Sequence, residues 1–217
     1  MPAANIGLPQ VQFDAPRLLA HVYLYEIDSY LNKATNGTFV RWVDDITFAA
    51  DDEDQCKLIL RDLDTLLQMR GIRLNSGKTH VMPASTARRF FYQRENENLT
   101  RWTSEYDKSV DQKLPTGSTL IKVGKSFNRF IRREKFGHYD KIIKRFIGFA
   151  AKSKSDFALD YTLELLSSNP ELRNYVYWYA AELPPNTKTL KTIEKYLFSS
   201  GALDDTSQCQ IAKMLTD

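Results

Sequence analysis

The signal for β-strands in this chain is concentrated between residues 38 and 82. Two short runs, 38–42 and 46–50, are rich in β-branched and aromatic residues, and a third, 72–82, is interrupted by Asn-Ser-Gly. Such runs bounded by turn residues are typical of strands. From about residue 137 onward there is little strand signal, and apolar residues recur at helical spacing. We therefore expect an α+β fold followed by an all-α fold.

Two amphipathic helices are expected to frame the first two strands. One covers residues 14–33; the other covers 51–70, with acidic residues in its first turn and Gly71 at its C-terminal cap. The connection between the two strand runs is very short and holds Asp44 and Asp45, which predicts a β-hairpin with two carboxylates at its tip. The order of elements predicts an antiparallel sheet with helices on one face.

Changes in composition divide the rest of the chain. Residues 93–119 are polar and contain Asn, Pro and Gly, so we expect an exposed insertion or linker there. The short connections after it predict a helical bundle or an α-solenoid. Because no polar capping repeat follows its last helix, we expect the helical domain to be truncated. The expected helices are 139–152, 156–168, 170–182, 187–199 and 205–216. The expected parts of the chain are 1–92, 93–119, 120–150 and 151–217.

Length and composition exclude several classes of protein. The chain has 217 residues, of which 42% are hydrophobic and 26% charged, so it is neither disordered, collagen-like nor a disulfide scaffold. Its N-terminus lacks the basic start and apolar run of a signal peptide, and no apolar run is long enough to span a membrane. The two cysteines, Cys56 and Cys209, lie far apart, and we expect reduced thiols in a cytoplasmic protein.

Positive charge is concentrated in one segment. Between residues 122 and 145, nine basic residues stand against two acidic ones, an excess of +7, whereas the whole chain carries +3. Aromatic residues alternate with the basic ones, a combination that suits contacts with phosphates and stacking on bases. A solvated basic helix with its aromatic residues in the core is the alternative. The expected nucleic-acid contacts are Lys125, Arg129, Arg132 and Arg133.

The adjacent residues Asp44 and Asp45 are the strongest indication of chemistry. Carboxylates are ligands that Mg²⁺ prefers, together with substrate phosphates, and two-metal phosphoryl transfer depends on them. An ordinary polar turn is the alternative, but apolar and aromatic residues flank this pair on both sides. The Gly-Lys-Thr at 77–79 lacks the glycine that a P-loop needs five positions earlier, and the three histidines lack zinc-ligand spacing.

The segment Val-Arg-Trp-Val-Asp-Asp at 40–45, followed by Ile-Thr-Phe, resembles the (Y/F)xDD box of reverse transcriptases. Gly-Leu-Pro-Gln at 7–10, ahead of the helix at 17–20, resembles the segment that lines the template and the incoming nucleotide. Residues 71–79 resemble the palm segment whose lysine approaches the nucleotide phosphates. The sequence of residues 12–17 is most similar to that of bacterial abortive-infection and defence-associated reverse transcriptases, with retron and intron-type enzymes as the alternatives.

This resemblance implies a fold and an activity. Residues 1–92 would be the C-terminal part of a palm, 120–150 a thumb and 151–217 a helical-repeat domain. The implied activity is RNA-directed DNA polymerisation in bacterial antiphage defence, which transfers a nucleotide from a dNTP to a primer or protein hydroxyl with two Mg²⁺ ions. The implied partners are an RNA or DNA template-primer, the dNTP and a second copy bound through the C-terminal helices.

The resemblance also implies roles for individual residues. Asp44 would be the main metal ligand and Asp45 a weaker or more distant one. Trp42 takes the place of the aromatic residue near the primer terminus, without the hydroxyl of the more usual tyrosine. Gln10 would lie by the template or the nucleotide, and Lys78 would stabilise phosphate charge or protonate pyrophosphate. From the residues alone, a solvent-facing lysine is the alternative for Lys78.

The family has another metal-binding aspartate on a strand well before the Gly-Leu-Pro-Gln segment, and six residues precede Gly7 here. We therefore expect a preceding or partner polypeptide to supply the fingers and that carboxylate, and we expect little polymerase activity from this chain by itself. The alternative of another class is a non-catalytic nucleic-acid-binding or assembly module derived from a reverse transcriptase, whose helical part mediates oligomerisation.

Overall fold

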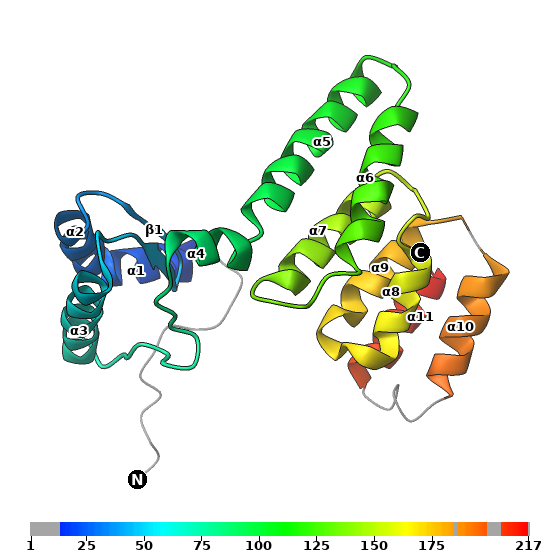
Figure 1. Ribbon diagram of the computed structural model, residues 1–217. Helices are drawn as coiled ribbons and strands as arrows, with labels where there is room; N and C mark the ends of the chain where they lie inside the picture. Colours follow the sequence, from blue (N-terminus) through cyan, green and yellow to red (C-terminus); the bar gives the residue numbers. More distant parts are fainter. Residues whose placement is uncertain (1–13, 185, 199–204, 217) are drawn as a thin grey trace, which may run out of the picture. The chain divides into compact units, whose positions relative to one another are not determined.

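The computed structural model describes residues 14–184, 186–198 and 205–216 (Figure 1). The chain divides into two compact units, unit 1 up to Pro83 and unit 2 from Ala84. Each unit has its own cluster of buried hydrophobic residues. In the described residues, no helix combines the length and the apolar content that a bilayer crossing requires.

Unit 1 contains the expected β-hairpin between helices. The strands pair antiparallel, with Phe39 opposite Phe48 and Trp42 opposite Asp45. The helix that follows begins with a side-chain cap, in which Asp52 accepts a hydrogen bond from the Gln55 amide at 2.7 Å. The elements are α1 (Asp14–Tyr23), α2 (Tyr25–Ala34), β1 (Phe39–Trp42), β2 (Asp45–Phe48) and α3 (Glu53–Met69).

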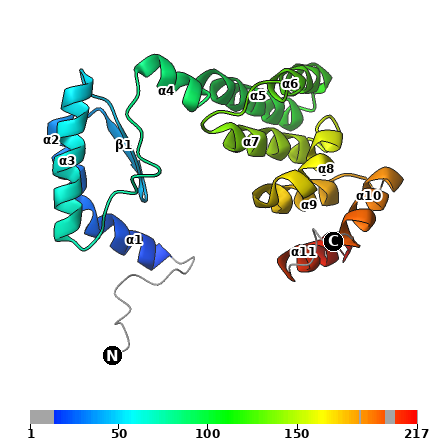
Figure 2. The ribbon, with the colours of Figure 1, turned by 60° about the horizontal axis from the view of Figure 1, so that its bottom comes forward.

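The hairpin packs one face against α2 and α3. Alternate strand residues are half-buried, and Phe39, Ile46 and Phe48 contact the apolar stripes of the two helices. Figure 2 shows α2 and α3 side by side with the hairpin next to them. The expected antiparallel pairing with helices on one face is therefore present for two of the three expected strands. The buried residues of these helices are Ile27, Leu31, Ile59, Leu63 and Leu67.

Two expectations for unit 1 are wrong in detail. The helix expected over 14–33 is two helices, because Leu24 interrupts the helical pattern between α1 and α2. The strand expected over 72–82 is not formed: Asn75 accepts a hydrogen bond from the Lys78 amide at 2.9 Å, which closes a turn. A strand needs a neighbour for its backbone groups, and the sheet of the described residues has only two strands.

Unit 2 is helical throughout its described residues. The helices expected over 139–152 and 205–216 are confirmed to the residue, and those expected near 156–168, 170–182 and 187–199 are present with shorter bounds. The elements are α4 (Ala84–Phe90), α5 (Gln93–Asp111), α6 (Gly117–Phe130), α7 (Tyr139–Lys152), α8 (Leu159–Ser168), η1 (Pro170–Leu172), α9 (Arg173–Glu182), α10 (Thr187–Leu197) and α11 (Asp205–Thr216).

The helices of unit 2 stack in alternation along the chain. Helix α7 contacts both α5 and α9, α9 contacts α11, and α8 contacts α10. Figure 2 shows the series descending from α5 and α6 to α10 and α11. Contacts between every second helix are the pattern of stacked helix pairs. Of the two expected arrangements, this pattern favours the α-solenoid type.

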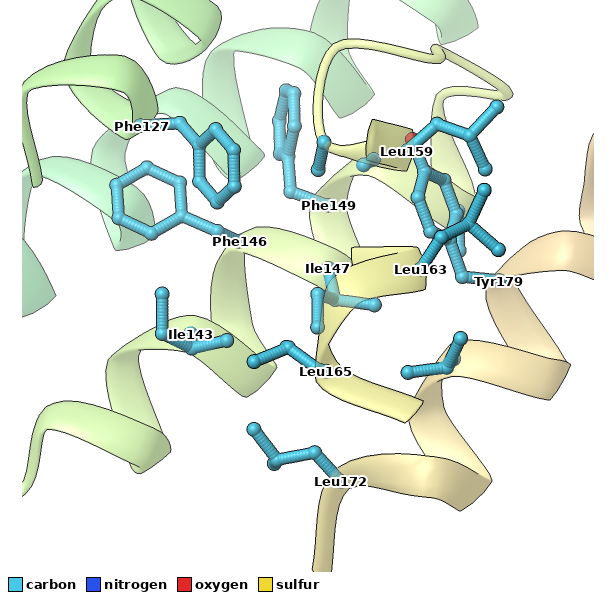
Figure 3. Packing of buried hydrophobic residues seen from close by; sticks show 14 of the residues in the cluster. Phe127, Ile143, Phe146, Ile147, Phe149, Leu159, Leu163, Leu165, Leu172 and Tyr179 are labelled. Atoms are coloured by element: carbon cyan, nitrogen blue, oxygen red, sulfur yellow. The ribbon is translucent and has the colours of Figure 1, made fainter. Parts of the chain in front are cut away.

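Helix α7 lies at the centre of the core of unit 2. Eight of its fourteen residues are buried, and a helix that is apolar on most sides must be covered on most sides. Its Phe146 ring meets Phe127 of α6 edge-on, with 5.5 Å between ring centroids. Figure 3 shows these rings beside the aliphatic side chains of α7 and α8.

The expected boundaries differ from the division that the structure makes. The polar segment 93–119, expected to be an insertion or linker, forms α5 and the start of α6. Its apolar stripe is narrow, with Leu99 buried and Trp102 and Tyr106 packed against the core of unit 2. One cluster of buried residues joins the segments 120–150 and 151–217, and the chain divides after Pro83 rather than after residue 92.

Candidate metal centre and nucleic-acid interface

The two carboxylates stand at the tip of the hairpin in unit 1. Val43 and Asp44 form the connection between the strands, and Asp45 is the first residue of β2. Both carboxylates are exposed, and the side chain opposite Asp45 is Trp42, which is 79% exposed. The hairpin thus presents carboxylate oxygens and an indole ring to solvent, on the side that α2 and α3 do not cover.

Arg41 fastens this turn to α2 from the buried side of the hairpin. Its guanidinium donates two hydrogen bonds to the Asp28 carboxylate, at 2.6 and 2.5 Å, and a third to the Val43 carbonyl at 2.8 Å. Only 6% of the Arg41 side chain is exposed. The hydrogen bond to Asp28 raises the pKa of Arg41 above its ordinary value. A partly buried charge pair therefore holds the backbone immediately before Asp44.

Val43 adopts a backbone conformation that β-branched residues rarely take. Its φ is 56°, in the left-handed region, which costs an L-residue about 1–2 kcal/mol. Such strain persists where neighbouring contacts over-determine the conformation, and it clusters at functional sites. Here the hydrogen bond from Arg41 to the Val43 carbonyl is such a contact. The strain singles this turn out from an ordinary polar hairpin turn, which usually has Asn or Gly at such positions.

Replacing Val43 by Gly is expected to raise the free energy of unfolding of unit 1 by about 1 kcal/mol, because relief of the left-handed strain outweighs the added flexibility of Gly. Urea unfolding, followed through the amide signals of β1 and β2, measures the change. Val40→Gly on the exposed face of β1 is the control and should destabilise, since Gly weakens a strand. A Val43→Gly variant less stable than the wild type would contradict the strain.

The chemistry of the turn fits Mg²⁺ in part. Exposed carboxylates are hard oxygen ligands, and Mg²⁺ usually binds to one or two of them while retaining water and phosphate oxygens. Among the described residues there is no group of three or more His, Cys, Asp or Glu side chains that could enclose a metal ion. Asp44 and Asp45 provide two exposed carboxylates, so an Mg²⁺ ion bound by them would need its other ligands from water, phosphate or a further carboxylate.

Lys78 and Gln10 are the other two residues expected at this site. Lys78 is exposed in the turn that follows α3, and in the described residues no hydrogen bond or ion pair joins it to Asp44 or Asp45. Gln10, with the rest of the Gly-Leu-Pro-Gln segment, lies outside the described residues. The structure thus brings Trp42, Asp44 and Asp45 together and leaves Lys78 without a direct contact to them.

The basic segment of unit 2 presents one continuous face. Lys122, Lys125 and Arg129 recur at positions i, i+3 and i+7 of α6, and Arg132 follows three residues later in the connection to α7. All four are exposed. In the described part of the chain, none of the four takes part in an ion pair. This basic face, defined as Lys122, Lys125, Arg129 and Arg132, is therefore available to phosphates.

Other members of the segment have structural roles. Phe127, Phe130 and Phe146 are buried in the core, which agrees with the alternative considered for the aromatic residues. Arg133, a residue expected to contact nucleic acid, instead forms an ion pair with Glu95 at 2.6 Å. Arg145 donates hydrogen bonds to the carbonyl and side-chain oxygens of Asn96 on α5, at 3.0 and 2.7 Å, and burial lowers its pKa.

Sequence reasoning did not find the supporting pair, Asp28 and Arg41. The signal was present, because a charged residue at the Arg41 position of an alternating strand must face the same side as Phe39. An inward-facing guanidinium needs a partner, but nothing in the pattern of α2 distinguishes Asp28 from its other acidic residue.

Comparison with known proteins adds no relative from which a role could be transferred. No protein-family model matches the chain, and neither the curated proteins nor the solved structures include a match. The case for a function therefore depends on the geometry of the turn and of the basic face.

Proposed function

We propose that this chain is part of a reverse-transcriptase-like nucleotidyltransferase, in which the hairpin turn of unit 1 binds Mg²⁺ and the basic face of unit 2 binds nucleic acid. The observation that carries the proposal is the turn itself. Asp44 and Asp45 are adjacent, exposed and held on a strained backbone by the partly buried pair of Arg41 and Asp28. A turn that only connects two strands requires neither the strain nor this charge pair.

The reaction proposed is attack of a primer or protein hydroxyl on the α-phosphorus of a dNTP. A new P–O bond forms, the hydroxyl proton passes to water, and pyrophosphate leaves with the electrons of the broken P–O bond. Bound Mg²⁺ supplies charge neutralisation at the phosphates and activation of the hydroxyl. Asp44 holds the ion as the principal ligand and Asp45 as the weaker one, while Trp42 packs beside the primer terminus. Lys78 serves as the cation for the leaving pyrophosphate.

The partial site implies a further contribution. Two-metal transfer needs more carboxylate oxygens than the turn offers. We propose that a polypeptide carrying fingers and a further aspartate completes the site, and that the basic face holds a template-primer through its phosphates. The setting proposed is the bacterial cytoplasm, in antiphage defence. A second copy of the chain would associate through the C-terminal helices, where the exposed side chains of Trp178 and Leu215 lie.

The test is nucleotide incorporation with and without the completing polypeptide. The 217-residue chain is mixed with the product of the reading frame directly upstream, and incorporation of labelled dNTP on a primed template is measured with Mg²⁺ and with EDTA. Turnover is expected only in the mixture with Mg²⁺. Robust turnover by the chain alone would contradict the partial site, and no turnover in the mixture would overturn the proposed activity.

A non-catalytic nucleic-acid-binding or assembly module is the second candidate. It is favoured by the stacked helices of unit 2, since such arrays provide extended binding surfaces. It predicts nucleic-acid binding that falls steeply with salt, no incorporation in any mixture, and no effect of Asp44→Ala on binding. An upstream frame without a strand bearing a metal-binding aspartate would favour this candidate.

A further inference from the structure

A second site is suggested by a hollow in unit 2 that neither the hairpin turn nor the basic face explains. It has a volume of about 730 Å³ and lies among the end of α4, the start of α5 and the connection between α6 and α7. Ligand pockets of proteins typically have volumes of about 300–1,000 Å³. The residues that give this hollow its character are Arg88, Arg89, Arg94, Arg133, Tyr92 and Phe136.

The walls of the hollow are fixed to one another. The His138 amide donates a hydrogen bond to the Phe90 carbonyl at 2.9 Å, which fastens the α6–α7 connection to the end of α4. The preceding residue must be glycine, because Gly137 has a φ of +51° and a Cβ there would lie 2.5 Å from the Phe90 carbonyl oxygen. The Phe90 ring meets the Phe136 ring edge-on, with centroids 5.7 Å apart. The hollow therefore exists before any ligand binds.

Among the described residues, three of the four arginines in the hollow lack a carboxylate partner. Arg133 is paired with Glu95, but in the part of the chain that the structure describes Arg88, Arg89 and Arg94 form no ion pair. All three are exposed. Guanidinium groups that share a small space repel one another, and an anion between them relieves the repulsion.

Two further glutamates belong to the lining without neutralising these arginines. Glu97 accepts a hydrogen bond from Gln93 at 2.8 Å, and Glu134 is exposed in the α6–α7 connection. They lower the positive potential of the hollow but do not pair with the arginines. Removing one of them should therefore strengthen the attraction for an anion, an effect opposite in sign to the loss of an arginine.

The chemistry of the lining selects among anions. The planar guanidinium fork matches phosphate oxygens with paired hydrogen bonds. Phe136 is 41% exposed, and Arg89 lies over its ring at 5.8 Å from the centroid, so an aromatic surface stands beside the cations. Three unpaired cations suit a terminal phosphate or polyphosphate, which carries more charge than an internal phosphodiester. We propose that this hollow binds the terminal phosphates of a nucleotide, either a free nucleotide or the 5′ end of a nucleic-acid strand.

This inference is independent of the proposed function, since the hollow includes no residue of the hairpin turn or of the basic face and no metal ion takes part. It is tested by binding of the full chain, in EDTA, to ATP and to fluorescent 12-mer oligonucleotides with either a 5′-phosphate or a 5′-hydroxyl. We expect the wild type to bind ATP, the 5′-phosphorylated strand in preference to the 5′-hydroxyl strand, or both. Asp44→Ala should behave as the wild type, which separates this test from that of the polymerase.

The variant Arg88→Gln with Arg89→Gln should weaken ATP binding, or the preference for the 5′-phosphate, by at least about tenfold, the effect of about one charge-assisted hydrogen bond. The matched control is Arg101→Gln with Lys108→Gln, which removes the same charge from an exposed part of α5 and should change either quantity less than about twofold. Glu134→Gln should tighten binding. Thermal unfolding by circular dichroism confirms that each variant folds.

The outcomes are decisive in each direction. Binding of ATP alone assigns the hollow to free nucleotides, and a preference for the 5′-phosphate assigns it to strand ends. Absence of both in the wild type overturns the proposal. An equal loss of binding in the arginine variant and in the control variant also overturns the proposal, because general electrostatic attraction would then account for the binding. Weaker binding by Glu134→Gln would contradict the charge argument.

Discussion

Replacing Asp44 by Ala is expected to reduce Mg²⁺-dependent nucleotide incorporation by about a thousandfold, equivalent to about 4 kcal/mol of transition-state stabilisation, when this chain is combined with the polypeptide proposed to complete its site. The variant lacks the carboxylate proposed as the principal Mg²⁺ ligand, while Arg41 and Val43 still form the turn. Because Asp44 is exposed, its loss should leave the stability of unit 1 nearly unchanged. Asp45→Ala should have a smaller effect on incorporation, since Asp45 is assigned as the weaker ligand.

The control for this prediction is Asp54→Ala. Asp54 is another exposed acidic residue of unit 1, in the first turn of α3 and away from the hairpin tip. Its replacement removes the same charge and should leave incorporation within about twofold of the wild type, because Asp54 belongs to α3 and not to the hairpin and salt screens interactions between exposed charges. Equal incorporation by the wild type and by Asp44→Ala would refute the role assigned to Asp44.

Replacing Asp28 by Ala is expected to lower the free energy of unfolding of unit 1 by about 2–4 kcal/mol. The substitution leaves the Arg41 guanidinium, whose side chain is only 6% exposed, without its carboxylate. A buried charge without a partner costs far more than the pair itself contributes. Since Arg41 also holds the Val43 carbonyl, the turn should loosen, and hydrogen exchange of the β1 and β2 amides should accelerate more than that of α3.

Two further variants separate this effect from the loss of any ion pair. Asp28→Asn keeps an acceptor for Arg41 and should cost less than Asp28→Ala. Glu26→Ala breaks the pair between Arg70 and Glu26, in which the Glu26 side chain is 57% exposed, and should cost no more than about 1 kcal/mol. If Asp28→Ala costs no more than Glu26→Ala, Arg41 does not fasten the turn as described.

The parts of the fold that the sequence predicts well are those decided by local pattern. The apolar positions of α7 recur at helical spacing, and both of its ends agree with the bounds expected from the sequence. The hairpin follows from two β-branched runs and a short connection, and Gly71 follows α3 with a φ of +72°. In each case a few neighbouring residues determine the structure.

The expectations that are wrong concern segments whose structure depends on contacts with residues far away in the sequence. Residues 72–82 contain a strand pattern but have no partner strand in the described chain. Helix α5 has a polar composition. Its narrow apolar stripe is buried only because α6 and α7 pack against it. Arg88 and Arg94 are unremarkable in the sequence, and they share a hollow only because the α6–α7 connection returns to α4. Local pattern carries no information about such contacts.

Binding of Mg²⁺ by the hairpin turn is tested by titrating the ¹⁵N-labelled chain with Mn²⁺ as a paramagnetic substitute. We expect the amide signals of residues 42–46 to broaden first and Asp44→Asn to abolish this broadening. The acidic start of α3, with Asp52 and Asp54, provides the internal reference for weak association of cations. Broadening that begins at α3, or that persists at the turn in Asp44→Asn, would show that the turn is not a metal site.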